Sequence, residues 1–139
     1  MSYYYENINI ESFKPIISPS IIKDEYPVNN TIISNIIKYR QTIIDILENR
    51  DNRFLVIVGP CSIHDYDAAI DYATQLKELS NLYPKLFIVM RVYFEKPRTN
   101  IGWKGFINDP TLENTLNINK GLKLARSLLL DIAKLELPT

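Results

Sequence analysis

The segment FLVIVGPCSIHDYDAAIDYATQLKELSNLYPKLFIVM (54–90) sets the architecture of this chain. It begins with FLVIV (54–58) and ends with LFIVM (86–90), two unbroken apolar runs that are typical of strands buried on both faces. Between these runs, apolar residues recur at helical spacing over 65–83, and Asp65 is a suitable N-cap. A strand, a helix and a second strand in this order form a parallel, right-handed βαβ unit. The segment therefore predicts an α/β fold.

Two unusual segments come directly after the two predicted strands. GPCSIHD (59–65) follows the first strand, and RVYFEKPRTNIGWKG (91–105) follows the second. The carboxyl ends of parallel strands open onto the same edge of a sheet, so we expect Cys61 and the 91–99 loop to lie on one edge. That edge carries the chemistry in (β/α)8 barrels and the ligand crevice in open α/β sheets. The order of the segments therefore predicts a functional site there.

The second segment is rich in positive charge, although the chain as a whole is neutral, with 16 Lys and Arg against 16 Asp and Glu. Arg binds carboxylate and phosphate through a planar fork, and Lys acts as a compact point charge. A solvated basic loop is the alternative interpretation. Pro97, Gly102 and the interleaved aromatic residues argue against it, because they indicate a fixed and partly packed path. The segment therefore predicts a site for a small phosphate- or carboxylate-bearing anion, and it contributes four cations against one acid: Arg91, Lys96, Arg98 and Lys104 against Glu95.

The spacing within this segment has a geometric consequence. If residues 91–96 formed one straight strand, Arg91 and Lys96 would point to opposite faces of the sheet. Both can reach a single ligand only where the chain bulges or turns between them. We therefore expect a break near Phe94 or Glu95.

Three motifs make the chain resemble a known family. GPCSIHD (59–65), MRVYFEKPRT (90–99) and GWKGFINDP (102–110) occur in the order seen in the microbial class I 3-deoxy-D-arabino-heptulosonate 7-phosphate (DAHP) synthases. LARSLLLDIAKLELPT (124–139) continues the resemblance, and FKPIISPSIIKDEYP (13–27) is similar to the N-terminal extension of that family. Asn100 departs from it, where Thr or Val is more frequent. The resemblance implies an α/β fold that is the N-terminal portion of a TIM (β/α)8 barrel with an N-terminal extension. Residues 1–29 would form the extension, with a role in subunit contacts and regulation, and residues 30–139 the first βα units of the barrel.

The resemblance also implies a reaction. The family condenses phosphoenolpyruvate with D-erythrose 4-phosphate and releases phosphate, the first step of the shikimate pathway to aromatic amino acids. It uses one divalent metal ion of the Mn, Fe, Co or Zn type, and Cys61 matches a metal ligand. Arg91 and Lys96 match the residues that hold phosphoenolpyruvate, while Arg98 and Thr99 match those that hold the phosphate of erythrose 4-phosphate. Lys96 is also a candidate for catalytic proton transfer to the aldehyde oxygen.

Several of these residues have a plainer interpretation. Cys61 is the only cysteine, and outside its motif it would be read as a small buried hydrophobe. His64 is the only histidine and is read as part of the helix start. Trp103 is expected to pack under the loop rather than to stack on a ligand, and Asp109 is expected to be a turn residue.

The length of the chain conflicts with a complete barrel, which needs about 250 residues, whereas this sequence has 139. The remaining His, Glu and Asp metal ligands of the family are expected beyond Thr139. We therefore expect a truncated synthase that is inactive alone, and that aggregates, folds partially or depends on a partner because its strand edges are open. One alternative is a non-catalytic fragment that serves as a binding or regulatory module. Another is a related phosphoenolpyruvate-condensing enzyme that makes a different sugar acid, against which the KPRT and GWKG motifs argue.

The remaining elements are predicted from periodicity and turn residues. We expect a short strand near 8–14, one or two helical turns near 20–26 and a long loop over 94–118. A helix over 30–50 is expected to bury Ile33, Ile36, Ile37, Ile43, Ile44 and Leu47. A helix over 119–136 is expected to bury Leu122, Ala125, Leu128, Leu129 and Ile132.

Composition limits the location and the partners. There is no run of eighteen apolar residues, which a membrane span would need, and MSYYYENINIES (1–12) lacks the pattern of a signal peptide. The neutral charge gives no general attraction to nucleic acid. We therefore expect a cytoplasmic enzyme. The resemblance also implies that the full-length protein forms a homodimer or homotetramer. It further implies that an aromatic amino acid acts as a feedback effector.

Overall fold

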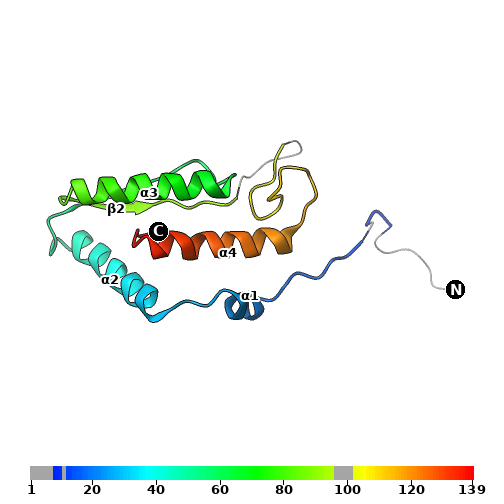
Figure 1. Ribbon diagram of the computed structural model, residues 1–139, viewed down its shortest axis with the longest axis horizontal. Helices are drawn as coiled ribbons and strands as arrows, with labels where there is room; N and C mark the ends of the chain where they lie inside the picture. The colour runs from blue at the N-terminus through cyan, green and yellow to red at the C-terminus, as the bar shows by residue number, and fades with distance from the viewer. Residues whose placement is uncertain (1–7, 11, 96–101) are drawn as a thin grey trace.

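The computed structural model describes residues 8–10, 12–95 and 102–139. Along the chain, the elements are α1 (Pro19–Glu25), α2 (Asn30–Leu47), β1 (Phe54–Val58), α3 (Tyr66–Leu82), β2 (Leu86–Met90) and α4 (Ile118–Lys134). β1 and β2 pair in parallel, with Phe54 opposite Leu86 and Val58 opposite Met90. The predicted βαβ unit is therefore confirmed. Figure 1 shows α3 and α4 running side by side next to the sheet.

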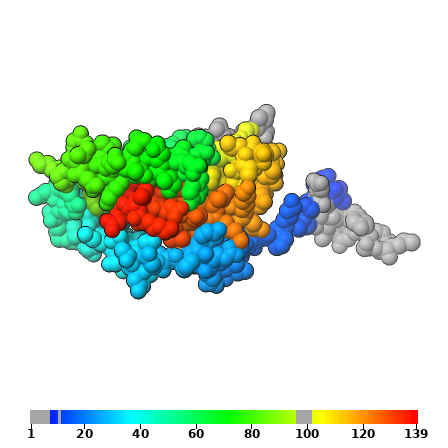
Figure 2. Space-filling view, in the orientation of Figure 1, coloured from blue at the N-terminus to red at the C-terminus, as the bar shows by residue number. Residues whose placement is uncertain are grey.

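The hydrophobic core lies where α3 and α4 meet one face of the sheet. Leu128 and Ile132 of α4 are fully buried, together with Ala73 of α3, and Ile88 and Met90 supply the sheet side of the cluster. The space-filling view shows the surfaces of α3 and α4 in contact (Figure 2). The predicted inward face of α4 is confirmed at Ala125, Leu128 and Ile132, while Leu122 and Leu129 are half-buried.

Helix α2 lies against the other side of the strand pair. The ring of Tyr39 is 6.3 Å from that of Phe87, and the guanidinium of Arg53 lies 5.1 Å from the centre of the same ring. The predicted buried face of α2 is wrong, because the helix meets β1 and Phe87 with the side that carries Ile32 and Tyr39. Ile43 is half-buried, and the remaining members of the predicted face are exposed and not covered by any described element: Ile33, Ile36, Ile37, Ile44 and Leu47.

The N-terminal segment has a helix where one was predicted and no strand. Ser18 caps α1 through its side chain, and Pro19 is its first residue, so the predicted helical turns near 20–26 are confirmed. Residues 8–10 and 12–14 pair with no strand, so the predicted strand near 8–14 is wrong for the described residues. Instead, the backbone of 15–17 bonds to the side chain of Asn119, which accepts from the Ile17 N–H at 2.9 Å and donates to the Pro15 carbonyl at 3.1 Å.

Within the described residues, none of the helices combines the length and the apolar character needed to cross a membrane.

Candidate functional site

The two strand ends meet closely at the carboxyl edge of the sheet. The Arg91 N–H donates to the Val58 carbonyl at 2.8 Å, one residue beyond the last paired positions of β1 and β2. A Cβ atom on Gly59 would lie 2.3 Å from the Arg91 carbonyl oxygen, so any larger residue would push the two chains apart. Glycine at this position therefore allows the GPCSIHD segment to cross directly beside the start of the basic loop.

Arg91 and Cys61 lie on the same edge, as the sequence predicted. The Nη1 group of Arg91 donates to the carbonyl oxygens of Pro60 and Cys61, both at 2.7 Å. Its guanidinium carbon also lies 4.5 Å from the centre of the Tyr93 ring. A guanidinium has five N–H donors in one plane, and Nη1 supplies two of them. These contacts therefore orient the group while leaving it capacity to bind an anion.

Arg91 and Cys61 are also accessible. Both residues are exposed at this edge of the sheet. The Ile63 N–H donates to the Tyr93 carbonyl at 2.7 Å, which fastens the Cys61 segment to the chain that follows β2. Two segments about thirty residues apart in the sequence are thus held together by backbone bonds at this edge.

The chain after β2 turns back on itself. The Phe106 N–H donates to the Phe94 carbonyl at 2.9 Å, and Glu95 forms an antiparallel bridge with Gly105. The rings of Phe94 and Phe106 stack with their centres 5.8 Å apart. Phe94 and Glu95 therefore pair with the returning chain and not with β1. Lys96 lies outside the described residues, so the predicted break between Arg91 and Lys96 stays a prediction.

The returning chain is organised by Asp109. This residue is only 4% exposed, and its carboxylate accepts from the Asn114 N–H at 3.1 Å and the Thr115 N–H at 3.3 Å. Its carbonyl accepts from Trp103 Nε1 at 2.7 Å. Trp103 thus packs within the loop, and Asp109 shapes a turn, as predicted. The sequence did not reveal that Asp109 is buried, although an Asp that begins a turn often bonds the backbone N–H groups that follow.

The loop also rests closely on α4. A Cβ atom on Gly121 would lie 1.9 Å from the Ile107 carbonyl oxygen, so the backbones of the loop and the helix touch there. Because α4 is held by the core, this contact connects the loop to the most buried part of the molecule.

The structure places the predicted site residues unevenly. Cys61 and Arg91 are brought together, whereas Lys96, Arg98 and Thr99 lie outside the described residues. His64 is exposed beside Asp65, whose carboxylate caps α3 by accepting from the Ala68 N–H at 2.7 Å. In the part of the chain that is described, no three His, Cys, Asp or Glu side chains gather as they would around a metal ion.

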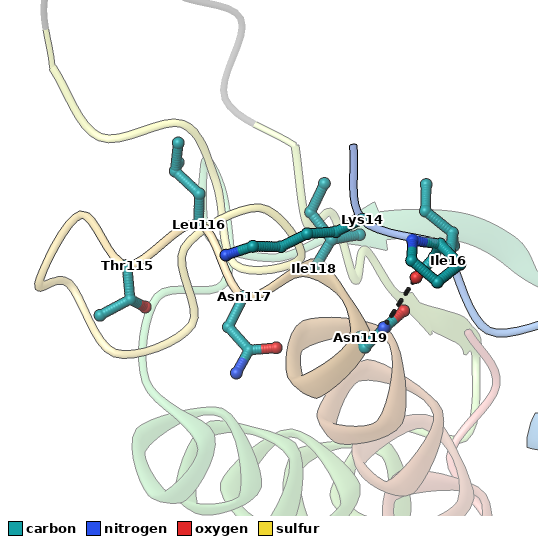
Figure 3. A pocket seen from close by; sticks show the side chains of 8 residues that line it. Lys14, Ile16, Thr115, Leu116, Asn117, Ile118 and Asn119 are labelled. Atoms are coloured by element: carbon teal, nitrogen blue, oxygen red, sulfur yellow. Dashed lines mark hydrogen bonds between the residues drawn. The ribbon is translucent and has the colours of Figure 1, made fainter. Parts of the chain in front are cut away.

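Two cavities lie near these segments. One of about 250 Å³ lies between the N-terminal segment and the start of α4, and its lining residues include Lys14, Thr115 and Asn117 (Figure 3). Another of about 190 Å³ lies beside the GPCSIHD segment, between Pro60 and Tyr72. Neither of these two is lined by Cys61 or Arg91, which are exposed at the edge of the sheet.

Comparison with known proteins agrees with the geometry. The family model described as "DAHP synthetase I family" matches residues 25–136. A phospho-2-dehydro-3-deoxyheptonate aldolase from Amycolatopsis methanolica is 50% identical over 125 residues, which cover 89% of this chain and 62% of that protein. The Phe-sensitive enzyme of the same name from Escherichia coli K12 is 46% identical over 139 residues, which cover 99% of this chain and 40% of that protein.

A solved structure gives the same result. The phospho-2-dehydro-3-deoxyheptonate aldolase of Francisella tularensis SCHU S4 superimposes with a TM-score of 0.87 at 52% identity, covering 94% of this chain and 38% of that one. The chain thus spans between 40% and 62% of the length of the two curated relatives described above. Since the family model matches most of its residues, the chain belongs to the DAHP synthetase I family.

Proposed function

We propose that this chain supplies the first part of the active site of a DAHP synthase. The reaction condenses phosphoenolpyruvate with D-erythrose 4-phosphate to give DAHP and inorganic phosphate, at the entry to aromatic amino acid biosynthesis. One observation carries the proposal: the Arg91 guanidinium is bonded to the Cys61 carbonyl at the carboxyl edge of a parallel strand pair. The names of the relatives, all phospho-2-dehydro-3-deoxyheptonate aldolases, support it.

The fold that we propose for the complete protein is a (β/α)8 barrel, in which residues 30–139 form the first units. Two observations support it. On β1, Phe54 and Ile57 are exposed, as expected of strand residues that further strands or helices would cover. On the other edge of the pair, the Met90 N–H donates to the Pro138 carbonyl at 2.7 Å, which places the chain after α4 beside β2.

For residues 1–29 we propose a role in subunit contacts and feedback regulation within a homodimer or homotetramer. The exposed apolar side chains of Ile10, Phe13 and Ile16 support a contact role. An aromatic amino acid is the proposed effector, because relatives are named Phe-sensitive or Trp-sensitive.

The roles of the cations follow from the charges of the substrates. Both substrates carry several negative charges, so bringing them together is electrostatically unfavourable unless fixed positive groups offset the repulsion. Arg91 and Lys96 would hold phosphoenolpyruvate, and Arg98 and Thr99 would hold the phosphate of erythrose 4-phosphate. Carbon 3 of phosphoenolpyruvate then bonds to the aldehyde carbon, water adds at carbon 2 and phosphate leaves. Lys96 would deliver a proton to the aldehyde oxygen.

Cys61 fits the role of a metal ligand. Its side chain is exposed at the edge where Arg91 would hold substrate, and a thiolate suits Zn and other divalent transition metals. Because no group of three ligand side chains forms within the described residues, a complete site needs ligands from elsewhere. A bound divalent ion would supply Lewis acidity to the aldehyde carbonyl.

The test uses the protein expressed from the complete reading frame that contains these residues. We expect phosphate release from phosphoenolpyruvate that requires erythrose 4-phosphate and is abolished by a chelator. Arg91→Ala should lower kcat/KM about 10- to 100-fold, because it removes charge-assisted hydrogen bonds to an anion.

Arg53→Ala is the matched control, since Arg53 precedes β1 at the opposite end of the strand pair and pairs with Asp51. Phosphate release without erythrose 4-phosphate, or equal losses in the two Arg variants, would contradict the proposal. Near-normal turnover of Lys96→Met would exclude the proton-transfer role of that residue alone.

A non-catalytic binding or regulatory module is the second candidate, and the exposed apolar residues of α2 favour it. A reading frame that ends at Thr139, with a product that lacks activity but binds a synthase subunit, would support this alternative.

A further inference from the structure

An aromatic ring lies under the guanidinium of Arg91. The guanidinium carbon is 4.5 Å from the centre of the Tyr93 ring, a separation at which a cation is attracted to a ring face. The two residues are two positions apart, the spacing at which side chains of an extended chain lie on one side. Tyr93 is 40% exposed and does not belong to the hydrophobic core. Packing of the core therefore does not explain the position of this ring.

The other contacts of Arg91 use one end of its guanidinium. Nη1 donates to the carbonyl oxygens of Pro60 and Cys61, both at 2.7 Å, and these bonds occupy its two N–H groups. Among the described residues, Nε and Nη2 make no hydrogen bond. Nε–H and one Nη2–H point in the same direction and form the fork that binds a carboxylate or a phosphate through two bonds. Arg91 thus keeps one complete fork for an anion.

Bonds from a single nitrogen restrain the guanidinium incompletely. A hydrogen bond tolerates donor angles well below 180°, so the group can tilt while both Nη1 bonds persist. The ring of Tyr93 opposes this tilt, because the contact is lost when the guanidinium moves away from the ring face. The backbone of Tyr93 is itself held, since its carbonyl accepts from the Ile63 N–H at 2.7 Å. The ring therefore connects Arg91 to a fixed part of the chain.

We propose that Tyr93 is a positioning residue for Arg91. Its ring holds the guanidinium so that Nε and Nη2 stay available to a carboxylate or phosphate group. The ring face acts, rather than the hydroxyl, because the contact with Arg91 is made by the ring. The identity of the anion as phosphoenolpyruvate rests on the proposed function, whereas the restraint of Arg91 by Tyr93 does not.

The first measurement needs no substrate. Phenylglyoxal bonds to both Nη atoms of an arginine, so its reaction with Arg91 requires Nη1 to leave the Pro60 and Cys61 carbonyls. In the protein expressed from the complete reading frame, the rate at Arg91 is followed by mass spectrometry of its peptides. Tyr93→Leu should be modified about two- to fivefold faster, because a cation–π contact is lost. Tyr93→Phe keeps the ring and should react at the wild-type rate.

Two controls separate this effect from a general change in the protein. Arg53 lies 5.1 Å from the Phe87 ring centre, and its rate in the same digests should be equal in all variants. Tyr83→Leu removes an exposed ring at the C-cap of α3 and should leave the Arg91 rate unchanged. If Tyr93→Leu does not fold, Tyr93→Trp replaces it and should slow the modification, because Trp makes the strongest cation–π contact. An unchanged or faster rate in Tyr93→Trp would overturn the proposal.

The kinetic measurement separates positioning from stability. Tyr93→Leu should raise the KM for phosphoenolpyruvate about two- to fivefold and change kcat less than twofold, because Arg91 would hold the substrate equally in the ground state and the transition state. Tyr93→Phe should match the wild type in both constants.

Each outcome decides a separate step of the proposal. Equal modification of Tyr93→Leu and the wild type, or a Tyr93→Phe variant that reacts as fast as Tyr93→Leu, would overturn the restraint of Arg91. Faster modification with an unchanged KM would overturn its consequence for substrate binding. If the wild-type protein has no synthase activity and phosphoenolpyruvate does not slow the modification of Arg91, while the variants differ as expected, the proposed function fails and the restraint stands.

Discussion

Helices α2 and α4 are alike in length and pattern but differ in what they meet. They have 18 and 17 residues, and both carry apolar side chains at helical spacing. On α4, Leu128 and Ile132 are fully buried, whereas on α2 Ile37 is 62% exposed and Leu47 is 70% exposed. Periodicity therefore identifies which face of a helix is apolar. It does not tell whether another part of the described chain covers that face.

The candidate site lies next to α3 and α4, the helices that pack into the hydrophobic core, and this part of the molecule is called the packed side below. The loop over 102–117 touches α4 at Gly121, and the GPCSIHD segment leads into α3 through the Asp65 cap. The edge that carries Arg91 is thus supported by the two helices with the best-covered apolar faces. If the support is as unequal in solution, substitutions among the buried residues of α4 should be more destabilising than those on the exposed face of α2.

The largest effect is expected in the core. Ile132→Ala should lower the free energy of unfolding by about 2–5 kcal/mol, because it leaves a cavity between α4, α3 and the sheet. Ile37→Ala on the exposed face of α2 should change it by less than about 0.5 kcal/mol. Urea denaturation of both variants checks the pair. An equally large loss at Ile37 would mean that the α2 face is covered in solution.

The next effect is expected where the strand ends meet. Gly59→Ala should cost about 1–3 kcal/mol, because the added methyl overlaps the Arg91 carbonyl oxygen and the chains must separate. Ala68→Ser, an exposed change early in α3, is the control for a substitution near the same loop. Equal denaturation midpoints for the two variants would show that the close approach of Gly59 is unimportant.

The structure confirms much of what the sequence predicted for the packed side. The runs 54–58 and 86–90, the helix between them and the Asp65 cap are local features that periodicity and capping residues encode. The convergence of Arg91 and Cys61 followed from topology alone, because parallel strands end at one edge. The roles of Lys96, Arg98 and Thr99 stay predictions, since these residues lie outside the described part.

The features that were predicted wrongly or not at all depend on contacts between residues that are far apart in the sequence. The face of α2 that is buried was predicted wrongly, because its position depends on where Phe87 and β1 meet it. Residues 15–17 take their hydrogen bonds from Asn119, a residue about one hundred positions away, so no local pattern could reveal them. The hydrogen bond from Asn108 Nδ2 to Glu95 Oε2 was also not predicted, because it depends on how the chain over 102–108 returns to Glu95.

The N-caps of α3 and α2 allow the stability of the packed helix and of the exposed helix to be compared. Asp65 caps α3 by accepting from the Ala68 N–H at 2.7 Å, and Asn29 caps α2 by accepting from the Ile32 N–H at 2.8 Å. Replacing either residue by Ala should cost its helix about 1 kcal/mol. For Asp65→Ala we expect the loss to appear in global unfolding, since α3 belongs to the core.

For Asn29→Ala we expect faster hydrogen exchange confined to the first turns of α2. Amide exchange followed by mass spectrometry separates the two cases. Uniformly faster exchange throughout the protein in Asn29→Ala would show that α2 unfolds together with the core.

The smallest effect concerns a hydrogen-bonded carboxylate that joins α3 to α4. Asp131 accepts from Lys134 Nζ at 2.8 Å and from the Tyr66 hydroxyl at 2.5 Å. These bonds, first that from Lys134 and then that from Tyr66, lower the pKa of Asp131 below its usual value of 3.8. A carboxyl whose folded pKa is lowered adds stability above its unfolded pKa, and that stability is lost as the pH falls through the folded pKa.

We therefore expect Asp131→Asn to weaken the loss of stability below about pH 4, when unfolding free energies are compared between pH 6 and pH 2.5. The contribution should be at most about 1 kcal/mol, because the Asp131 side chain is partly exposed and solvent screens the Lys134 pair. Asp45 on α2 is the matched control, since a hydrogen bond from Arg50 lowers its pKa in the same direction and its side chain is 32% exposed, against 37% for Asp131. Salt at 0.5 M should weaken the Asp45 effect more than the Asp131 effect, because Arg50 is charged whereas the Tyr66 hydroxyl, which also bonds to Asp131, is neutral. Equal salt sensitivity at the two carboxylates would mean that the bond from Tyr66 contributes little to the effect of Asp131.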